Sequence, residues 1–222
     1  MRTACLARVV SMALLPAMAG IASGAANDGL TLADGFSAVV VHEGQGTGRH
    51  LTVAANGDVY LAGGNGLSAL RDTNGDGKAD VVTPFGDVKG TEVRIFRNWL
   101  YVSDDVGVYR YALKKGELAP TGARETVVSE FPKERQHADK TFALDTKGTL
   151  YVNVGAPSNS CQQKDRQEGS LGQDPCPILE KYGGVWVFDG TKLNQTPANG
   201  RRFATGMRNA LPGIWQSVVS MA

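Results

Sequence analysis

Short runs of apolar and β-branched residues recur along the chain, and turn residues separate them. The strand-like runs span residues 37–42, 50–55, 58–63, 99–104, 107–113, 149–155 and 184–190. Gly, Asn and Asp cluster between them, and no run has the long 3.6-residue apolar period of a substantial helix. The pattern therefore predicts an all-β chain, folded as a sandwich, barrel or propeller.

A repeat narrows the choice among these folds. Tyr60, Tyr101 and Tyr151 each lie inside a strand-like run, 41 and 50 residues apart, and each run is followed by a second run that begins at glycine. A unit of turns and strands every forty to fifty residues is typical of β-propeller blades. At this spacing the chain holds about four blades, and it stops without a closing strand, so we expect an incomplete propeller.

The first 26 residues have the pattern of a secretory signal peptide. Arg2 and Arg8 give a positive start, residues 9–22 are apolar, and small residues follow. The alternative is a membrane anchor, but the apolar run is short and Pro16 interrupts it. We therefore expect cleavage near residue 26, a partial propeller domain over residues 27–222, and a periplasmic or secreted protein.

Charge argues against some classes of partner. Without Arg2 and Arg8, the 23 Lys and Arg fall to 21, against 22 Asp and Glu, and no basic block stands out. Nucleic-acid binding needs a concentrated basic face, so it is not expected. No run beyond the signal peptide is apolar enough to suggest a membrane span.

Two cysteines remain after the signal peptide. Cys161 and Cys176 lie fifteen residues apart in a polar segment, and in an exported chain this spacing predicts a disulfide. Closing a loop of this length is worth about 3 kcal/mol in the loop-entropy description. The alternative is a metal-binding pair, but two cysteines without a nearby histidine make an incomplete zinc site.

Residues 72–80 hold the most specific local motif. Asp72, Asn74 and Asp76 alternate, a glycine follows, and Asp80 comes three residues after that. Alternating oxygen ligands on a tight loop resemble the first part of a calcium loop. The position that needs a bidentate glutamate holds a threonine, so a plain Asx-rich hairpin turn is the alternative to structural calcium.

His137 and the pair Arg208–Asn209 are candidates for chemistry. His137 precedes the strand-like residues 142–145, and histidine serves as a general base because it titrates near neutral pH. Loops at one end of a propeller channel often build ligand sites. Arg208 offers a fork of cationic donors, and Asn209 offers a donor and an acceptor. Surface or packing roles are the alternatives for all three residues. His50 stands in a similar place to His137 and His42 ends a strand-like run.

Five stretches occur together in an order that resembles a known family. They are residues 69–80 (ALRDTNGDGKAD), 100–111 (LYVSDDVGVYRY), 137–161 (HADKTFALDTKGTLYVNVGAPSNSC), 175–189 (PCPILEKYGGVWVFD) and 203–210 (FATGMRNA). Over roughly residues 30–209 the chain resembles the soluble quinoprotein sugar dehydrogenases, close to the sorbosone dehydrogenase group. The resemblance implies a six-bladed β-propeller that binds pyrroloquinoline quinone (PQQ) at the top of its channel.

The resemblance also assigns roles to residues. His137 takes the hydroxyl proton of a sugar alcohol or aldehyde hydrate while hydride moves to the quinone C5, and Arg208 and Asn209 hydrogen-bond the quinone oxygens. Gln136 stands where glucose-oxidising relatives carry an acidic residue. The remaining quinone contacts and the catalytic calcium ligands of the family lie in later blades, so the chain is expected to hold about half a cofactor site and to be inactive alone.

Two further classes of function are alternatives to the one that this resemblance implies. A non-catalytic exported propeller that binds a carbohydrate or a partner protein is the main alternative. A propeller hydrolase is less favoured because the sequence offers neither a metal cluster nor a nucleophile triad.

Overall fold

The computed structural model describes residues 30–44 and 46–211, so the expected signal peptide over residues 1–26 lies outside the described part. Contacts divide the chain into two units, residues 1–39 and 40–222. Residues 30–39, the described part of the first unit, hold no helix or strand. Among the described residues, no helix is long and apolar enough to cross a membrane.

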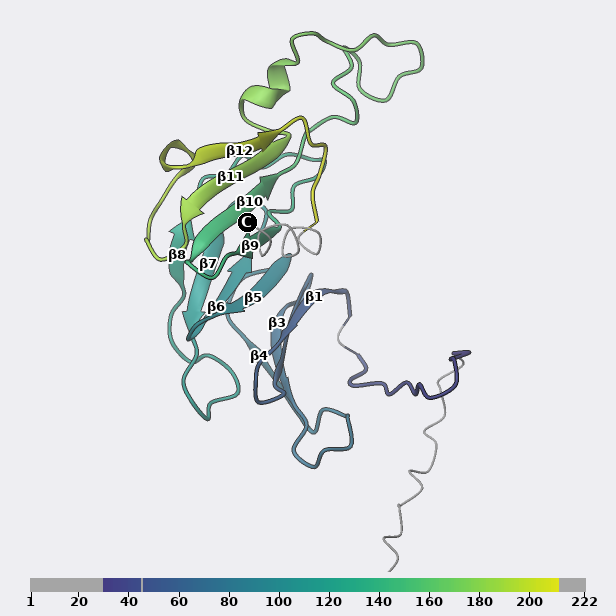
Figure 1. The fold of residues 1–222 in the computed structure, drawn as a ribbon, viewed down its shortest axis with the longest axis vertical. Coiled ribbons are helices and arrows are strands. Elements are labelled where there is room, and N and C mark those ends of the chain that lie inside the picture. The colour runs from purple at the N-terminus through teal and green to yellow at the C-terminus, as the bar shows by residue number, and fades with distance from the viewer. Residues whose placement is uncertain (1–29, 45, 212–222) are drawn as a thin grey trace, which may run out of the picture. The chain divides into compact units, whose positions relative to one another are not determined.

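The second unit contains three four-stranded antiparallel sheets, in which each strand pairs with its neighbours in sequence (Figure 1). The first sheet consists of β1 (Gly48–Val53), β2 (Val59–Gly63), β3 (Gly66–Arg71) and β4 (Val81–Phe85). The second consists of β5 (Glu92–Phe96), β6 (Trp99–Ser103), β7 (Val108–Ala112) and β8 (Glu125–Val128). The third consists of β9 (Phe142–Leu144), β10 (Thr149–Val154), β11 (Gly184–Asp189) and β12 (Arg201–Thr205). The described helices are two short 3₁₀ turns, η1 (Pro177–Glu180) and η2 (Pro197–Asn199).

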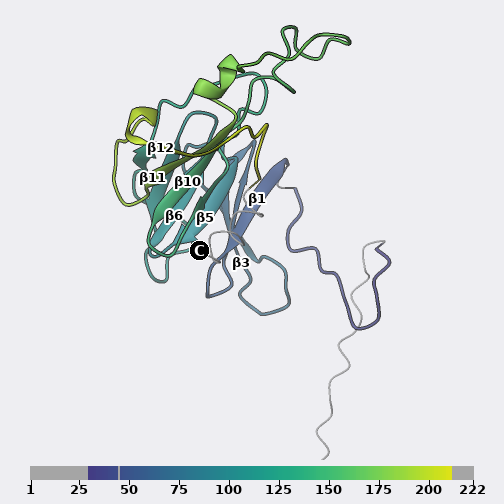
Figure 2. The ribbon, with the colours of Figure 1, turned by 45° about the horizontal axis from the view of Figure 1, so that its top comes forward.

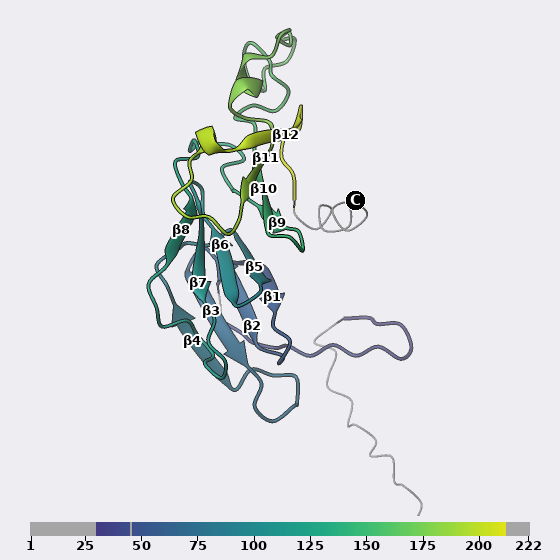
Figure 3. The ribbon, with the colours of Figure 1, turned by 60° about the vertical axis from the view of Figure 1, so that its left-hand side comes forward.

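The sheets pack face to face, with their first strands β1, β5 and β9 nearest one another (Figure 3). One apolar core lies between the first and second sheets and includes Ala62, Leu100 and Val102. Another lies between the second and third sheets and includes Val152 and Phe188. Truncating a fully buried leucine in such a core costs about 2–5 kcal/mol. Packing between sheets is therefore the main source of stability.

The repeated tyrosines lie on the second strand of each sheet, which gives the repeat a structural meaning. Tyr60 Oη donates to the Leu118 carbonyl at 2.9 Å, and Tyr101 Oη donates to the Gly190 carbonyl at 2.9 Å. Both acceptors lie between the third and fourth strands of the following sheet. The repeat thus supplies equivalent hydrogen bonds between successive sheets.

The predicted fold class, an all-β incomplete propeller without a substantial helix, is confirmed. The described residues form three sheets where the repeat spacing indicated about four. The difference arises because residues 30–47 and 155–183 are largely irregular and contribute no strand to a sheet.

The strand predicted at residues 37–42 is wrong. Its valines are exposed, Val41 by 46 %, and the described residues provide no strand to pair with it. Strand propensity alone cannot hold a segment extended when its backbone groups lack a partner strand. The Val41 carbonyl instead accepts the Ala79 N–H at 2.8 Å.

Candidate functional site

His137 lies in the irregular segment between β8 and β9, next to the end of the third sheet. Its backbone φ is 51°, in the left-handed region that few side-chain-bearing residues adopt. Such strain persists only where the surrounding contacts determine the conformation, and it concentrates at functional sites. Those contacts come from the segment that follows β10.

The imidazole of His137 has a defined orientation. Its Nδ1 lies 2.6 Å from the carbonyl oxygen of Ala156. A carbonyl only accepts hydrogen bonds, so Nδ1 must carry a proton, and in the neutral ring Nε2 keeps its lone pair. That is the tautomer a general base requires.

Gly155 allows this approach because it has no side chain. A Cβ added there would lie 2.5 Å from both the Cβ and the carbonyl oxygen of His137, and 3.2 Å from Asn209 Oδ1. His137 and Asn209 therefore both lie against Gly155, where a larger residue would not fit. The structure thus brings together two residues that are distant in the sequence.

Buried Asn153 on β10 holds the segment that contains Arg208 and Asn209. Its Nδ2 donates to Asn209 Oδ1 at 2.8 Å, and its Oδ1 accepts the Ala210 N–H at 3.0 Å. Thr141 Oγ1 donates to the Ala210 carbonyl at 2.7 Å. The segment after β12 is thereby attached to β10 and to the residue just before β9.

Arg208 is attached to the same region by two contacts. Its carbonyl accepts the Ala156 N–H at 2.8 Å, and its Nη1 donates to Asn159 Oδ1 at 2.8 Å. Its other guanidinium donors make no hydrogen bond or ion pair with any described residue, and neither does the Asn209 Nδ2. Exposed cationic and amide donors beside an imidazole with a free lone pair suit an anionic ligand rich in carbonyl and carboxylate oxygens.

The predicted disulfide is present and closes the loop beside this site. Cys161 and Cys176 are bonded, with their Cα atoms 6.1 Å apart. Figure 2 shows this segment and η1, in green, projecting beyond the end of the third sheet. A pocket of about 210 Å³ lies between the disulfide, η1 and Arg208, and it is lined mainly by apolar atoms.

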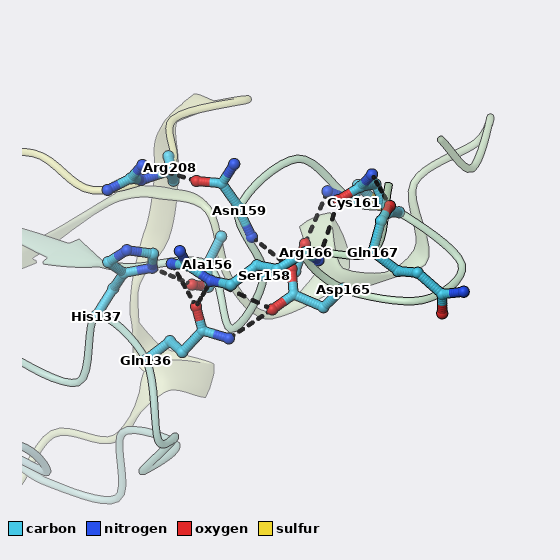
Figure 4. A network of polar contacts seen from close by, with 11 residues as sticks. Gln136, His137, Ala156, Ser158, Asn159, Cys161, Asp165, Arg166, Gln167 and Arg208 are labelled. Carbon is cyan, nitrogen blue, oxygen red and sulfur yellow. Dashed lines mark hydrogen bonds and ion pairs between the residues drawn. The ribbon is translucent and has the colours of Figure 1, made fainter. Parts of the chain in front are cut away.

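The disulfide loop contacts both sides of the site (Figure 4). Asp165 accepts a hydrogen bond from the side chain of Gln136 at 2.6 Å and from the backbone N–H of Asn159 at 2.9 Å. Arg166 donates to Gln136 Oε1 at 3.0 and 2.8 Å. Gln136 precedes His137, and Asn159 holds Arg208, so the loop is linked to all three predicted site residues or their neighbours.

Two buried ionisable groups lie at the same end of the sheets. The fully buried Glu92, at the start of β5, has its pKa raised to about 7 by burial, against the opposing effects of Arg94 and Arg49. Its Oε2 has no hydrogen-bond partner among the described residues. Lys140, 1 % exposed, donates to the Ala138 carbonyl, and burial lowers its pKa to about 8.

A cavity of about 620 Å³ lies between the first and second sheets at this end. Arg49 and Lys133 contribute cations to its lining, and Asp104 and Asp105 contribute carboxylates. Arg49 also forms an ion pair with Asp139, two residues after His137. Arg49 therefore contacts both the cavity and the segment that contains His137.

The other two histidines occupy different surroundings. His50 Nδ1 hydrogen-bonds the Thr91 carbonyl and lies 3.5 Å from Glu92 Oε2, so it belongs to the contact between β1 and β5. His42 is exposed and lies outside the strands. Of the three histidines, only His137 lies beside Arg208 and Asn209.

The Asp72–Asp80 loop is built from its own hydrogen bonds and lies between β3 and β4. The Asp72 carboxylate accepts backbone N–H groups from Asn74, Gly75 and Gly77 at 3.0, 2.7 and 2.8 Å. These bonds, that to Gly77 first, lower the pKa of Asp72. Asp80 accepts hydrogen bonds from the backbone and the hydroxyl of Thr73.

This geometry is that of the Asx-rich turn that was the alternative to calcium. Asp76 Oδ1 accepts the Lys78 N–H at 2.8 Å, and Asn74 Oδ1 accepts the Asp76 N–H at 2.9 Å. Within the described part of the chain, no three His, Cys, Asp or Glu side chains are grouped to hold a metal ion. Calcium binding at Asp72, Asn74, Asp76 and Asp80 stays a prediction.

Three residues of the site escaped sequence reasoning. Asn153 had a detectable signal, because it is a polar amide within the apolar run of β10, and a buried polar side chain needs a specific partner. Asn159 and Asp165 had none, because they lie in a polar loop where such residues are ordinary.

The chain matches no protein-family model and no curated protein. It is similar in structure to the holo form of the pyranose dehydrogenase PQQ domain from Coprinopsis cinerea, with a TM-score of 0.64, 20 % identity, and coverage of 81 % of this chain and 43 % of that one. It is also similar to iodide and calcium structures of Trichoderma reesei Carbohydrate-Active Enzymes Family AA12, with TM-scores of 0.64, 17 % identity, and coverage of 80 % of this chain and 45 % of theirs. The likeness shows a shared fold, and the chain spans less than half the length of these structures.

Proposed function

We propose that this chain forms part of an exported PQQ-dependent oxidoreductase that oxidises a sugar or a sugar aldehyde of the sorbosone or glucose type. One observation carries the proposal: His137, Arg208 and Asn209 meet at Gly155 and Ala156, on a sheet array shared with a PQQ domain. Since the chain spans less than half of its structural neighbours, the complete site is expected to need further residues.

The chain's own residues suit three tasks in such a reaction. His137 Nε2 accepts the proton of the sugar hydroxyl, because Nδ1 is held in its protonated form by Ala156. Arg208 and Asn209 would hold the oxygens of the cofactor, where their donors would favour negative charge. When bound, PQQ supplies the two-electron acceptor for hydride from the sugar carbon.

The deciding experiment measures PQQ binding to the 222-residue chain by equilibrium dialysis, with and without calcium. We expect Arg208→Leu to weaken binding at least tenfold, since it removes a charge-assisted contact. The control is Arg201→Leu, which removes an exposed arginine on β12 and should leave binding unchanged. The half-site in this chain is expected to bind PQQ weakly, so absence of detectable PQQ binding to the wild-type chain contradicts the proposal. Binding of a sugar without PQQ favours the alternative, a non-catalytic exported propeller.

Dye reduction with PQQ, calcium and a panel of aldoses and sorbosone tests His137. The chain alone is expected to be inactive, so the assay needs a protein in which the rest of the cofactor site is present. Any sugar-dependent rate should fall about a hundredfold or more in His137→Gln, the usual contribution of a general base, but not in His42→Gln. A rate unaffected by His137→Gln removes His137 from the proposed mechanism.

A further inference from the structure

Asp165 lies at the centre of a network that links the two sides of the candidate site (Figure 4). Its Oδ2 accepts from Gln136 Nε2 at 2.6 Å, and its Oδ1 accepts the Asn159 N–H at 2.9 Å. The pKa of Asp165 is lowered, first by the Asn159 bond and then by the Gln136 bond. The carboxylate is therefore held in its charged form by these two partners.

Each partner of Asp165 leads to a different part of the site. Gln136 is the residue before His137, whose backbone is strained and whose ring contacts Ala156. Asn159 Oδ1 accepts from Arg208 Nη1 at 2.8 Å. One carboxylate thus connects the candidate base with the candidate cofactor-binding arginine.

Arg166 determines which end of the Gln136 amide faces Asp165. A guanidinium only donates, so the two contacts from Arg166 require Gln136 Oε1 on its side. Gln136 Nε2 then points to Asp165 and needs an acceptor there. Because the Asn159 N–H also needs an acceptor, both Asp165 oxygens must accept, and an amide at this position could satisfy only one.

The disulfide loop is built to present this carboxylate. The bond between Cys161 and Cys176 closes the loop, and Gln163 N–H donates to the Leu171 carbonyl across it at 2.9 Å. Six non-glycine residues of the described chain have positive φ, and three of them are His137, Cys161 and Arg166. Half of these strained positions thus fall in one network, which is where function concentrates strain.

We propose that Asp165 is a positioning residue that couples the orientation of His137 to that of Arg208, an inference that rests on the proposed function. It also accounts for Gln136, which stands where glucose-oxidising relatives carry an acidic residue. The negative charge comes instead from Asp165, 29 residues further along the chain. Asp165 fixes the side chain of Gln136, and Gln136 in turn restricts the conformation of the adjacent His137.

The test uses the PQQ-free 222-residue chain, so it does not depend on enzyme activity. Nitrogen-15 NMR follows the His137 ring and the Arg208 guanidinium, and hydrogen exchange follows the Asn159 amide. In Asp165→Asn we expect both side-chain signals to shift and the Asn159 amide to exchange about tenfold faster or more, since one of the two acceptor oxygens at position 165 is lost. The matched control, Glu168→Gln, changes an exposed carboxylate of the same loop and should change neither.

A second variant separates the two branches and serves if Asp165→Asn fails to fold. Arg166→Met removes the donors to Gln136 and the 3.7 Å ion pair with Asp165, but leaves the bond between Asp165 and Asn159. It should shift the His137 signal and leave the Arg208 signal in place. Coupling is disproved if Asp165→Asn folds, frees the Asn159 amide, and leaves both His137 and Arg208 signals unchanged.

PQQ binding distinguishes this inference from the proposed function. If the wild-type chain binds PQQ, Asp165→Asn should weaken binding about tenfold, the loss expected when a buried or charged hydrogen-bond partner is removed. If the wild-type chain does not bind PQQ, the proposed function fails, while the NMR shifts still decide whether Asp165 couples His137 to Arg208.

Discussion

The Asp72–Asp80 loop and the cluster around His137 are both sets of polar side chains, but they are assembled differently. Hydrogen bonds of the loop join residues two to seven positions apart. Bonds of His137, Arg208 and Asn209 span 19, 49 and 56 residues. The loop can therefore form from its own sequence, whereas the cluster exists only once the third sheet has formed.

The comparison also applies to charge. In the loop, exposed carboxylates gather backbone N–H groups and the pKa of Asp72 is lowered. At the sheet end near His137, burial raises the pKa of Glu92 instead. The pKa of a carboxyl is thus lowered where nearby backbone N–H groups surround it and raised where tertiary packing buries it.

The largest effect is expected from Gly155→Ala, which tests whether the cluster depends on long-range packing. The new Cβ would lie 2.5 Å from the His137 carbonyl oxygen and Cβ, so His137 and Asn209 must separate. We expect a loss of about 3 kcal/mol of stability, at the upper end for overpacking, together with loss of PQQ binding. Thermal melting and equilibrium dialysis measure the two effects.

Gly172→Ala is the matched control for that substitution. A Cβ at Gly172 meets nothing within 4 Å, so stability and binding should match the wild type. If Gly155→Ala also resembles the wild type, neither stability nor PQQ binding depends on the close approach of the His137 and Asn209 segments. The His137 cluster would then not depend on long-range packing as proposed.

An intermediate effect is expected from Glu92→Gln, and it depends on pH. Folded Glu92 keeps its proton up to about pH 7, against an ordinary value of 4.5, so between these values the folded state binds more protons than the unfolded chain. Its contribution to the free energy of unfolding therefore falls as pH rises through this window, by on the order of 3 kcal/mol, and stays low above pH 7.

Denaturant unfolding of wild type and Glu92→Gln at pH 4.5, 6 and 8 checks this. The glutamine variant should gain stability relative to the wild type as pH increases. Glu117→Gln, at an exposed carboxylate, should show no such trend. A constant difference between wild type and Glu92→Gln across the three pH values would show that Glu92 does not titrate as its burial implies.

The smallest effect is expected from Asp72→Asn, which tests the local side of the comparison. The lowered pKa of Asp72 means that its charged form stabilises the fold above about pH 3.8, and that this contribution disappears as pH falls through the folded value. The variant should melt slightly below wild type at pH 7, approach it as the pH falls below 3.8, and bind PQQ normally.

Calcium sharpens this last prediction. Glu168→Gln is the control, because this exposed carboxylate lies outside the Asp72–Asp80 loop. A calcium-dependent rise in melting temperature that Asp72→Asn abolishes would establish the structural calcium site. A loss of PQQ binding in Asp72→Asn would contradict the distinction between the two regions, because a change in a loop held by its own hydrogen bonds should not affect the His137 cluster.

Strand prediction succeeded where period-two apolar runs and turn residues agreed. β2, β6, β10 and β11 lie within the predicted runs, and the tyrosine repeat marks the second strand of each sheet. β4, β5, β8 and β12 were missed because charged or proline residues interrupt them, and pairing with a neighbouring strand overrides such weak local preference. Pro84, for example, is tolerated because β4 is an edge strand.

The sequence by itself determined the all-β class, the blade repeat, the disulfide pairing and the identity of His137, Arg208 and Asn209 as candidates. Each of these depends on local pattern, spacing or residue chemistry. Tertiary structure alone decided that the three candidates meet at Gly155 and Ala156 and that Asp165 reaches Gln136. The reason is physical: hydrogen bonds between residues 19 to 57 positions apart form only when sheet pairing brings their segments together, and no local pattern encodes that approach.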